Sequence, residues 1–237
     1  MIAELSGKNN GRALIWFRKD LRLQDNPCLE AALKAKKEII PVFIWNKEEG
    51  GDWSPGAASR WWLHHALKSL GTDIAKYGGH LILRIGKAEE IIPELIDGMG
   101  IDTVYYGRTY DPAGLATQNT VEAKLSEKPC SVESFNTSLL QDPWEIKNGS
   151  GRPFQVFTPY WRKCRSGIYK DVLIYSPDQL IFSNSLQDSL SVDQLELLPG
   201  HDWHLKLSNH WDVSESAAHK LIERTAEEVT HSYETAR

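Results

Sequence analysis

The sequence predicts an α/β protein: a doubly wound parallel sheet of five strands in the order 3-2-1-4-5, followed by a long connector and a terminal helix. The main observation is that short apolar segments alternate with helical segments from residue 12 to about residue 135. Strands joined by crossover helices run parallel and are covered on both faces, which gives a Rossmann-like arrangement. In addition, three helix starts pair a capping residue with a proline, at Asn26-Pro27, Ser54-Pro55 and Asp111-Pro112.

Each strand is predicted from a short run that is rich in β-branched or aromatic residues. The runs are Ala13–Phe17, Ile39–Trp45, His80–Ile85, Thr103–Tyr106 and Ser131–Phe135. Helices fill the gaps, the first opening at Asn26-Pro27 and the others covering Pro55–Tyr77, Ala88–Met99 and Pro112–Leu125. Pro93 lacks a backbone donor and is expected to kink its helix or to delay the first turns.

The chain divides into four parts. We expect a flexible leader over residues 1–11, an α/β domain over 12–135, an interdomain connector over 136–211 and a terminal helical segment over 212–237. The connector has turn residues and little periodicity, which indicates a segment that runs over a surface. The terminal helix, from about Val213 to Thr235, is predicted to start with a capping box of Asp212 and Glu215. Its apolar stripe needs a partner surface.

Residues 147–170 hold six basic residues and no acid, with aromatic residues between them. Such a stretch suits either a single strand of nucleic acid or docking against another domain. Because the chain as a whole carries a net charge of −5, docking is the favoured interpretation.

Composition narrows the class of protein. With 237 residues, 41% of them hydrophobic, the chain is long enough for one sizeable domain and a smaller piece. It has no apolar run near the roughly 18 residues of a membrane span and no signal peptide at its start, so we expect no membrane partner and a cytoplasmic location. The three cysteines, Cys28, Cys130 and Cys164, form no metal pattern and are expected to be reduced and mostly buried. We therefore predict no metal site, and no catalytic motif such as Gly-x-Ser-x-Gly is present.

A charged turn follows the first strand, at the place where a dinucleotide-binding domain has glycines. Its sequence is Arg18-Lys19-Asp20-Leu21-Arg22, and neither Gly-x-Gly-x-x-Gly nor a P-loop is present. Two interpretations stay open: Arg18 and Lys19 contact an anionic ligand, or the charges pair across a domain interface. The second is favoured.

This turn lies within the string WFRKDLRLQDNPCL, residues 16–29, which resembles the N-terminal signature of the DNA photolyase and cryptochrome family. The resemblance continues in order through the rest of the chain. It includes Pro41–Trp45, Gly56–Leu63, Gly107–Pro112 and Phe157–Arg162.

The resemblance implies the N-terminal antenna domain of a blue-light-dependent deoxyribodipyrimidine photolyase, a flavoprotein lyase for repair of UV-damaged DNA. In that family, FAD and the damaged base bind in a C-terminal helical domain, of which residues 212–237 resemble the first helix. The sequence lacks that domain's FAD-binding motifs, so we expect no catalytic residue here, no FAD in this chain and no repair by it alone. Whether the protein is an enzyme stays open.

Two alternatives remain: a cryptochrome photosensor, and a nucleotide-binding regulatory protein of the universal-stress-protein type. The partners implied by the resemblance are the helical domain and, through it, UV-damaged DNA. Self-association of the chain is also expected, because its apolar stripe lacks a cover.

The carboxyl edge of the sheet, where strand order reverses, is the predicted site for an antenna chromophore. The lining residues are Phe17, Arg18, Phe43, Trp45, Ser59, Arg60, Leu63, Thr109, Tyr110, Asp111 and Gly114. Aromatic rings would stack on a planar ring, and Arg60 with the helix N-termini would meet a negative tail. The alternative is a structural role, in which these residues only pack against loops and against a domain interface.

The identity of the chromophore stays open among a folate, a deazaflavin and another flavin. The family's folate-binding Asn-Glu pair aligns with Ala113 and Gly114, and its deazaflavin-binding acid and arginine align near Thr109 and Ser59. Gly114 does match a glycine of the deazaflavin binders. A bulky residue at Gly114 is expected to abolish chromophore retention and to leave the fold intact.

Overall fold

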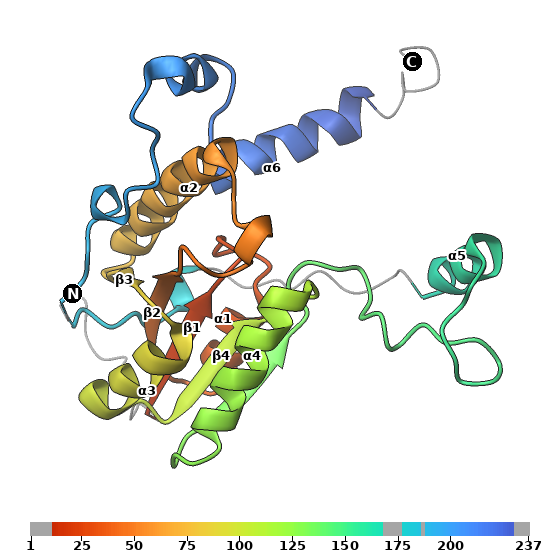
Figure 1. The fold of residues 1–237 in the computed structure, drawn as a ribbon, viewed down its shortest axis with the longest axis horizontal. Helices are drawn as coiled ribbons and strands as arrows, with labels where there is room; N and C mark the ends of the chain where they lie inside the picture. The colour runs from red at the N-terminus through yellow and green to blue at the C-terminus, as the bar shows by residue number, and fades with distance from the viewer. Residues whose placement is uncertain (1–10, 168–176, 186–187, 230–237) are drawn as a thin grey trace.

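The computed structural model describes residues 11–167, 177–185 and 188–229. Its centre is a sheet whose neighbouring strands are all parallel, in the order β3-β2-β1-β4-β5 (Figure 1). The strands are β1 (Arg12–Phe17), β2 (Glu38–Trp45), β3 (Ile82–Ile85), β4 (Thr103–Gly107) and β5 (Ser131–Phe135). The predicted fold class and strand order are confirmed, and the strand ends agree to within two residues.

Helices cover both faces of the sheet. They are α1 (Pro27–Lys34), α2 (Ala57–Lys76), α3 (Ala88–Met99) and α4 (Pro112–Leu125). Side chains alternate across each strand, so Ile15 packs with Leu67 of α2 in one core and Leu14 packs with Ile92 of α3 in the other. The two cores hold α1 and α2 on one face and α3 and α4 on the opposite face.

Two of the three predicted helix caps are confirmed. The side chains of Asn26 and Asp111 each accept a backbone N–H of the helix that they precede. Ser54, however, ends the short 3₁₀ turn η1 (Gly51–Trp53), and Gly56 is the N-cap of α2. The Ser54 hydroxyl donates back to carbonyl oxygens of the preceding loop, so it is not available to cap the following helix.

Pro93 lies inside α3, and the helix runs through it from Ala88 to Met99. The fixed φ of proline suits a helix, and the missing N–H removes one intrahelical bond near the N-terminus. Burial of one face of α3 in the second core offsets this loss. The helix begins at Ala88, as predicted, and it is not interrupted at Pro93.

The connector does more than run over a surface. Phe182 makes a parallel bridge to Ile39, beside the start of β2, and its ring is buried in the first core. Leu180, Leu195 and Leu197 are buried in the same core. Sequence periodicity missed this because single apolar residues in a polar segment dock against a sheet edge that only the folded structure provides.

The basic and aromatic stretch forms α5 (Phe157–Arg165), which Figure 1 shows standing away from the sheet. Phe157 and Trp161 are exposed, with parallel rings whose centroids are 6.4 Å apart. The helix therefore presents apolar rings beside its cations, an arrangement that suits both interpretations of this stretch.

The terminal helix α6 (Glu215–Arg224) begins later than predicted and continues as a π-helical turn over Thr225–Val229. Ser214, not Asp212, is its N-cap and accepts the Ala217 N–H. The predicted continuation to Thr235 and the leader 1–10 lie outside the described residues. Among the helices that the structure describes, none has the length and apolar character needed to cross a bilayer.

Candidate functional site

A cavity of about 640 Å³ opens at the carboxyl ends of the strands, next to the switch point between β1 and β4. Its walls come from the ends of β1 and β2, from one side of α2 between Ser59 and Asp73, from the first turn of α4, and from α6. This volume lies within the usual range for a small-molecule site. The doubly wound topology creates such a crevice because the chain leaves the central strands in opposite directions.

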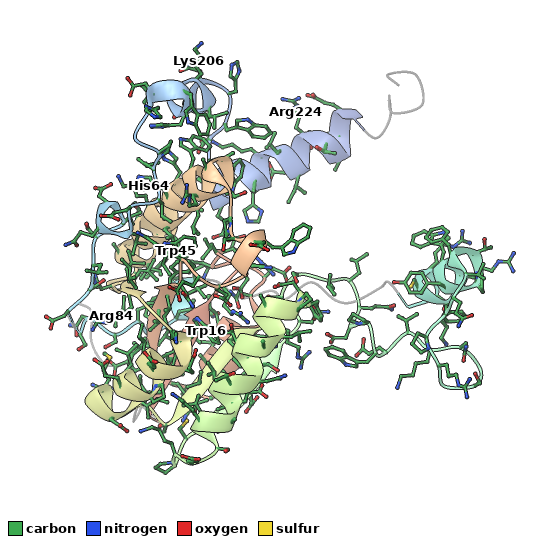
Figure 2. The ribbon with its side chains drawn as sticks, viewed as in Figure 1. Trp16, Trp45, His64, Arg84, Lys206 and Arg224 are labelled. Atoms are coloured by element: carbon green, nitrogen blue, oxygen red, sulfur yellow. The ribbon has the colours of Figure 1, made fainter. Side chains whose placement is uncertain are left out.

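Aromatic side chains form much of the inner wall. Phe17, Phe43 and Trp45 lie at the ends of β1 and β2, and Trp62 and Leu63 face them from α2. Figure 2 shows Trp45 within the molecule below α2. The Nε1 atom of Trp45 is buried, with no hydrogen-bond partner among the described residues. A buried donor without a partner is costly, so the other contacts of the Trp45 ring have to offset this loss.

Arg18 closes the base of the cavity. Its side chain is 7% exposed and donates to Gln118 Oε1 at 2.8 Å, to Thr109 Oγ1 at 3.1 Å and to Glu49 Oε1 at 3.1 Å. Its guanidinium also lies 4.4 Å from the centre of the Trp16 ring. Burial lowers the pKa of Arg18, and the adjacent Glu49 carboxylate opposes that shift. The guanidinium thus ties β1, the loop after β2 and α4 together.

The charged turn pairs within the α/β domain. Besides the contact of Arg18 with Glu49, Lys19 Nζ lies 2.6 Å from Asp111 Oδ2. The favoured expectation of pairing across a domain interface is wrong for these two residues, because loops after β2 and β4 bring acids to the same sheet edge. Asp111 also caps α4, so its carboxylate occupies the helix N-terminus that was expected to meet an anion.

Most of the predicted site residues are brought together. Those that line the cavity are Phe17, Arg18, Phe43, Trp45, Ser59, Leu63, Thr109, Asp111 and Gly114. Arg60 is not among the lining residues, and its Nε is buried without a partner. Tyr110 also lies elsewhere, because its hydroxyl donates to Asp142 Oδ1 at 2.6 Å. Burial, followed by this bond, raises the pKa of Tyr110 to about 12.

Gly114 is closely packed. A Cβ at this position would lie 2.9 Å from Thr109 Cβ and closer still to the Thr109 hydroxyl. Thr109 is itself buried and bonded to Gln118. This packing argues against the expectation that a bulky residue at Gly114 leaves the fold intact, since the clash would disturb the network around Arg18.

Sequence reasoning missed the contribution of α6. Val213, Ser214, Glu215, Ala218, His219 and Ile222 line the cavity from the side opposite the sheet. The sequence did show that this helix has an apolar stripe that needs a partner surface. That the helix lies against the cavity could not be predicted, because its position depends on the path of the connector. Figure 1 shows α6 beside the N-terminal end of α2.

A second, more polar hollow lies between α2 and the segment before α6. Its lining includes Trp61, His65, His210 and Trp211. Burial lowers the pKa of His65, with Lys68 and another imidazole as smaller causes. No group of three or more His, Cys, Asp or Glu side chains suited to a metal ion occurs in the described part of the chain.

The fold and the cavity at its switch point place the chain in the class of doubly wound α/β domains, which commonly bind ligands at that point of the sheet. Comparison with known proteins makes the assignment more specific. The DNA photolyase family model matches residues 13–177. On this match and the similarities below, the chain belongs to the photolyase and cryptochrome family and carries the family's N-terminal α/β domain.

The chain is 36% identical to a deoxyribodipyrimidine photo-lyase of Agrobacterium fabrum, over 94% of this chain and 46% of that protein. It is 34% identical to cryptochrome-2 of Arabidopsis thaliana, over 95% of this chain and 38% of that protein. The crystal structure of a bacterial class III photolyase from Agrobacterium tumefaciens superposes with a TM-score of 0.82 at 35% identity, covering 93% of this chain and 45% of that one. The chain thus spans less than half the length of these relatives.

Proposed function

We propose that this chain is the light-harvesting N-terminal part of a blue-light-dependent deoxyribodipyrimidine photolyase. The observation that carries the proposal is the aromatic cavity at the switch point of a family-typical α/β domain. A bound antenna chromophore would absorb light there and pass the excitation to FAD in the remainder of a longer protein. The similarity to photolyases over nearly the whole chain supports this role.

The residues of the cavity fit a planar, conjugated ligand. Rings of Phe17, Phe43 and Trp45 line the cavity and offer apolar surfaces against which such a ring would pack. Acidic side chains such as Glu49 and Asp111 line the cavity near Arg18 and Lys19, so the lining is not strongly cationic. A folate, a deazaflavin and another flavin all have such a ring, and the proposal is for this shared chemistry.

FAD binding and DNA repair are proposed for the rest of the longer protein. This chain alone is proposed not to hold FAD and not to repair dimers, and none of its residues is given a catalytic role. Exposed apolar residues of α5 and α6, among them Trp161 and Leu221, would meet the helical domain. In the isolated chain, self-association is proposed to cover them, which a concentration series in analytical ultracentrifugation tests.

A cryptochrome photosensor is the second candidate. The similarity to cryptochrome-2 of Arabidopsis, which covers almost all of this chain, favours it specifically. The two candidates share the antenna domain and differ in whether the full-length protein splits pyrimidine dimers under blue light. Repair of a dimer-containing oligonucleotide by the full-length protein supports the photolyase, and light-dependent flavin reduction without repair supports the cryptochrome.

The cavity itself is tested with a substitution that fills it. Ala66 lines the cavity from α2, so Ala66→Trp is expected to remove chromophore absorbance from the purified full-length protein. Ala116, exposed on α4 and outside the lining, gives the matched control Ala116→Trp, which is expected to keep it. Equal retention by both variants, with unchanged circular dichroism, would place the chromophore elsewhere.

A further inference from the structure

The cavity is not closed by the α/β domain alone. Helix α6 and the residues before it supply one wall, although more than 190 residues separate Glu215 from the loop that it contacts. No residue of α6 is buried, and Leu221 and Ile222 are 50% and 64% exposed. Burial of apolar surface therefore contributes little to the attachment of α6, and specific polar contacts contribute more.

Glu215 makes those contacts at the first position of α6. Its Oε2 accepts the Leu23 N–H and its Oε1 accepts the Gln24 N–H, each at 2.7 Å. The two amides belong to the loop between β1 and α1, which also lines the cavity. The Glu215 side chain is only 13% exposed, and its bond to the Leu23 amide is partly buried, whereas its bond to the Gln24 amide is exposed.

Two aromatic rings continue the contact beside this pair of bonds. Trp211, before α6, packs edge-on against Trp62 of α2, with 5.6 Å between the ring centres. His219, one turn further along α6, lies 3.7 Å from the Glu215 carboxylate and also lines the cavity. The helix is thus attached at its N-terminal end, next to the cavity. Figure 2 shows its far end, labelled at Arg224, extending away.

We propose that Glu215 is a positioning residue that fixes α6 as a wall of the ligand cavity, so that ligand retention depends on this carboxylate. The ligand part of the proposal rests on the function proposed above. Without Glu215 the helix still forms, because Ser214 caps it, but it no longer stays over the cavity. The side of the ligand that faces away from the sheet then opens to water.

The test compares Glu215→Ala and Glu215→Gln with Glu223→Ala, a matched loss of an exposed carboxylate on the same helix. In the unmodified chain the Leu23 and Gln24 amides are expected to be protected from hydrogen exchange. Glu215→Ala is expected to lower that protection at least tenfold. Glu215→Gln, which keeps one acceptor oxygen, is expected to be intermediate, and Glu223→Ala is expected to match the unmodified chain.

Ligand affinity is measured in parallel by fluorescence titration with two probes, flavin mononucleotide and 5,10-methenyltetrahydrofolate. For a probe that binds the unmodified chain, Glu215→Ala is expected to weaken binding roughly ten- to a hundredfold, the loss that two hydrogen bonds of ordinary net strength imply. Unchanged amide exchange in Glu215→Ala would overturn the proposal, as would faster exchange with unchanged affinity. If neither probe binds the unmodified chain, the proposed antenna function is contradicted, and the exchange result alone decides whether Glu215 holds α6.

Discussion

Arg18 offers the sharpest test of how the cavity is built. Replacing it by Met keeps an apolar stem of similar length beside the Trp16 ring and removes the guanidinium. The loss includes three hydrogen bonds to side chains, one of which is the ion pair with Glu49, in a side chain that is 7% exposed. Breaking a buried ion pair by removing one partner costs ~3–5 kcal/mol.

The structure places Arg18→Met at the lower end of that range. Glu49 is 29% exposed, so its carboxylate recovers water when the guanidinium is gone. Gln118 Oε1 keeps the Thr109 N–H at 2.6 Å and is not left unpaired. We expect a loss of ~3 kcal/mol in the free energy of unfolding, which is roughly a 150-fold change in the folding constant. In urea this corresponds to a midpoint lower by about 1 M.

The matched control is Lys19→Met, the neighbouring cation. Its ion pair with Asp111 is solvent-exposed, with side chains 69% and 42% accessible, so its loss is expected to cost less than about 1 kcal/mol. Urea unfolding followed by tryptophan fluorescence measures both variants. Equal costs for the two substitutions would refute the idea that Arg18 is a buried side chain that joins β1, the loop after β2 and α4.

Two further predictions concern the core and its protonation. Burial, and next the charge of Lys68, lowers the pKa of His64 below its usual range, so the unfolded chain binds more protons below about pH 6.5. Stability is therefore expected to fall as pH drops below about 6.5, and an NMR titration that finds an unperturbed His64 would contradict this. Gly79→Ala is expected to lower the free energy of unfolding by ~1–3 kcal/mol, because the new Cβ would lie 2.5 Å from Phe182 Cβ. Gly71 lies in open space on α2, so Gly71→Ala is expected to raise the free energy of unfolding by up to ~1 kcal/mol. Thermal unfolding measures both variants.

Much of the architecture follows from the sequence by itself. Strand β1, with its buried run from Ala13 to Phe17, and the caps at Asn26 and Asp111 rest on residues that are close together in the chain. Local periodicity and capping depend on such neighbouring residues, so both can be predicted without a structure. Parallel strands with right-handed crossovers then leave few possible orders, and the observed one was among them.

Tertiary structure alone decided how the charges and the cavity are completed. Arg18 contacts Glu49 and Gln118 only because the loop after β2 and the helix α4 that follows β4 lie at the same sheet edge as the end of β1. The sequence signalled that α6 has an apolar face, but not that Glu215 binds the loop after β1. These contacts join residues tens to almost two hundred positions apart. No local pattern encodes such a pairing, because it depends on the path of the whole chain between the partners.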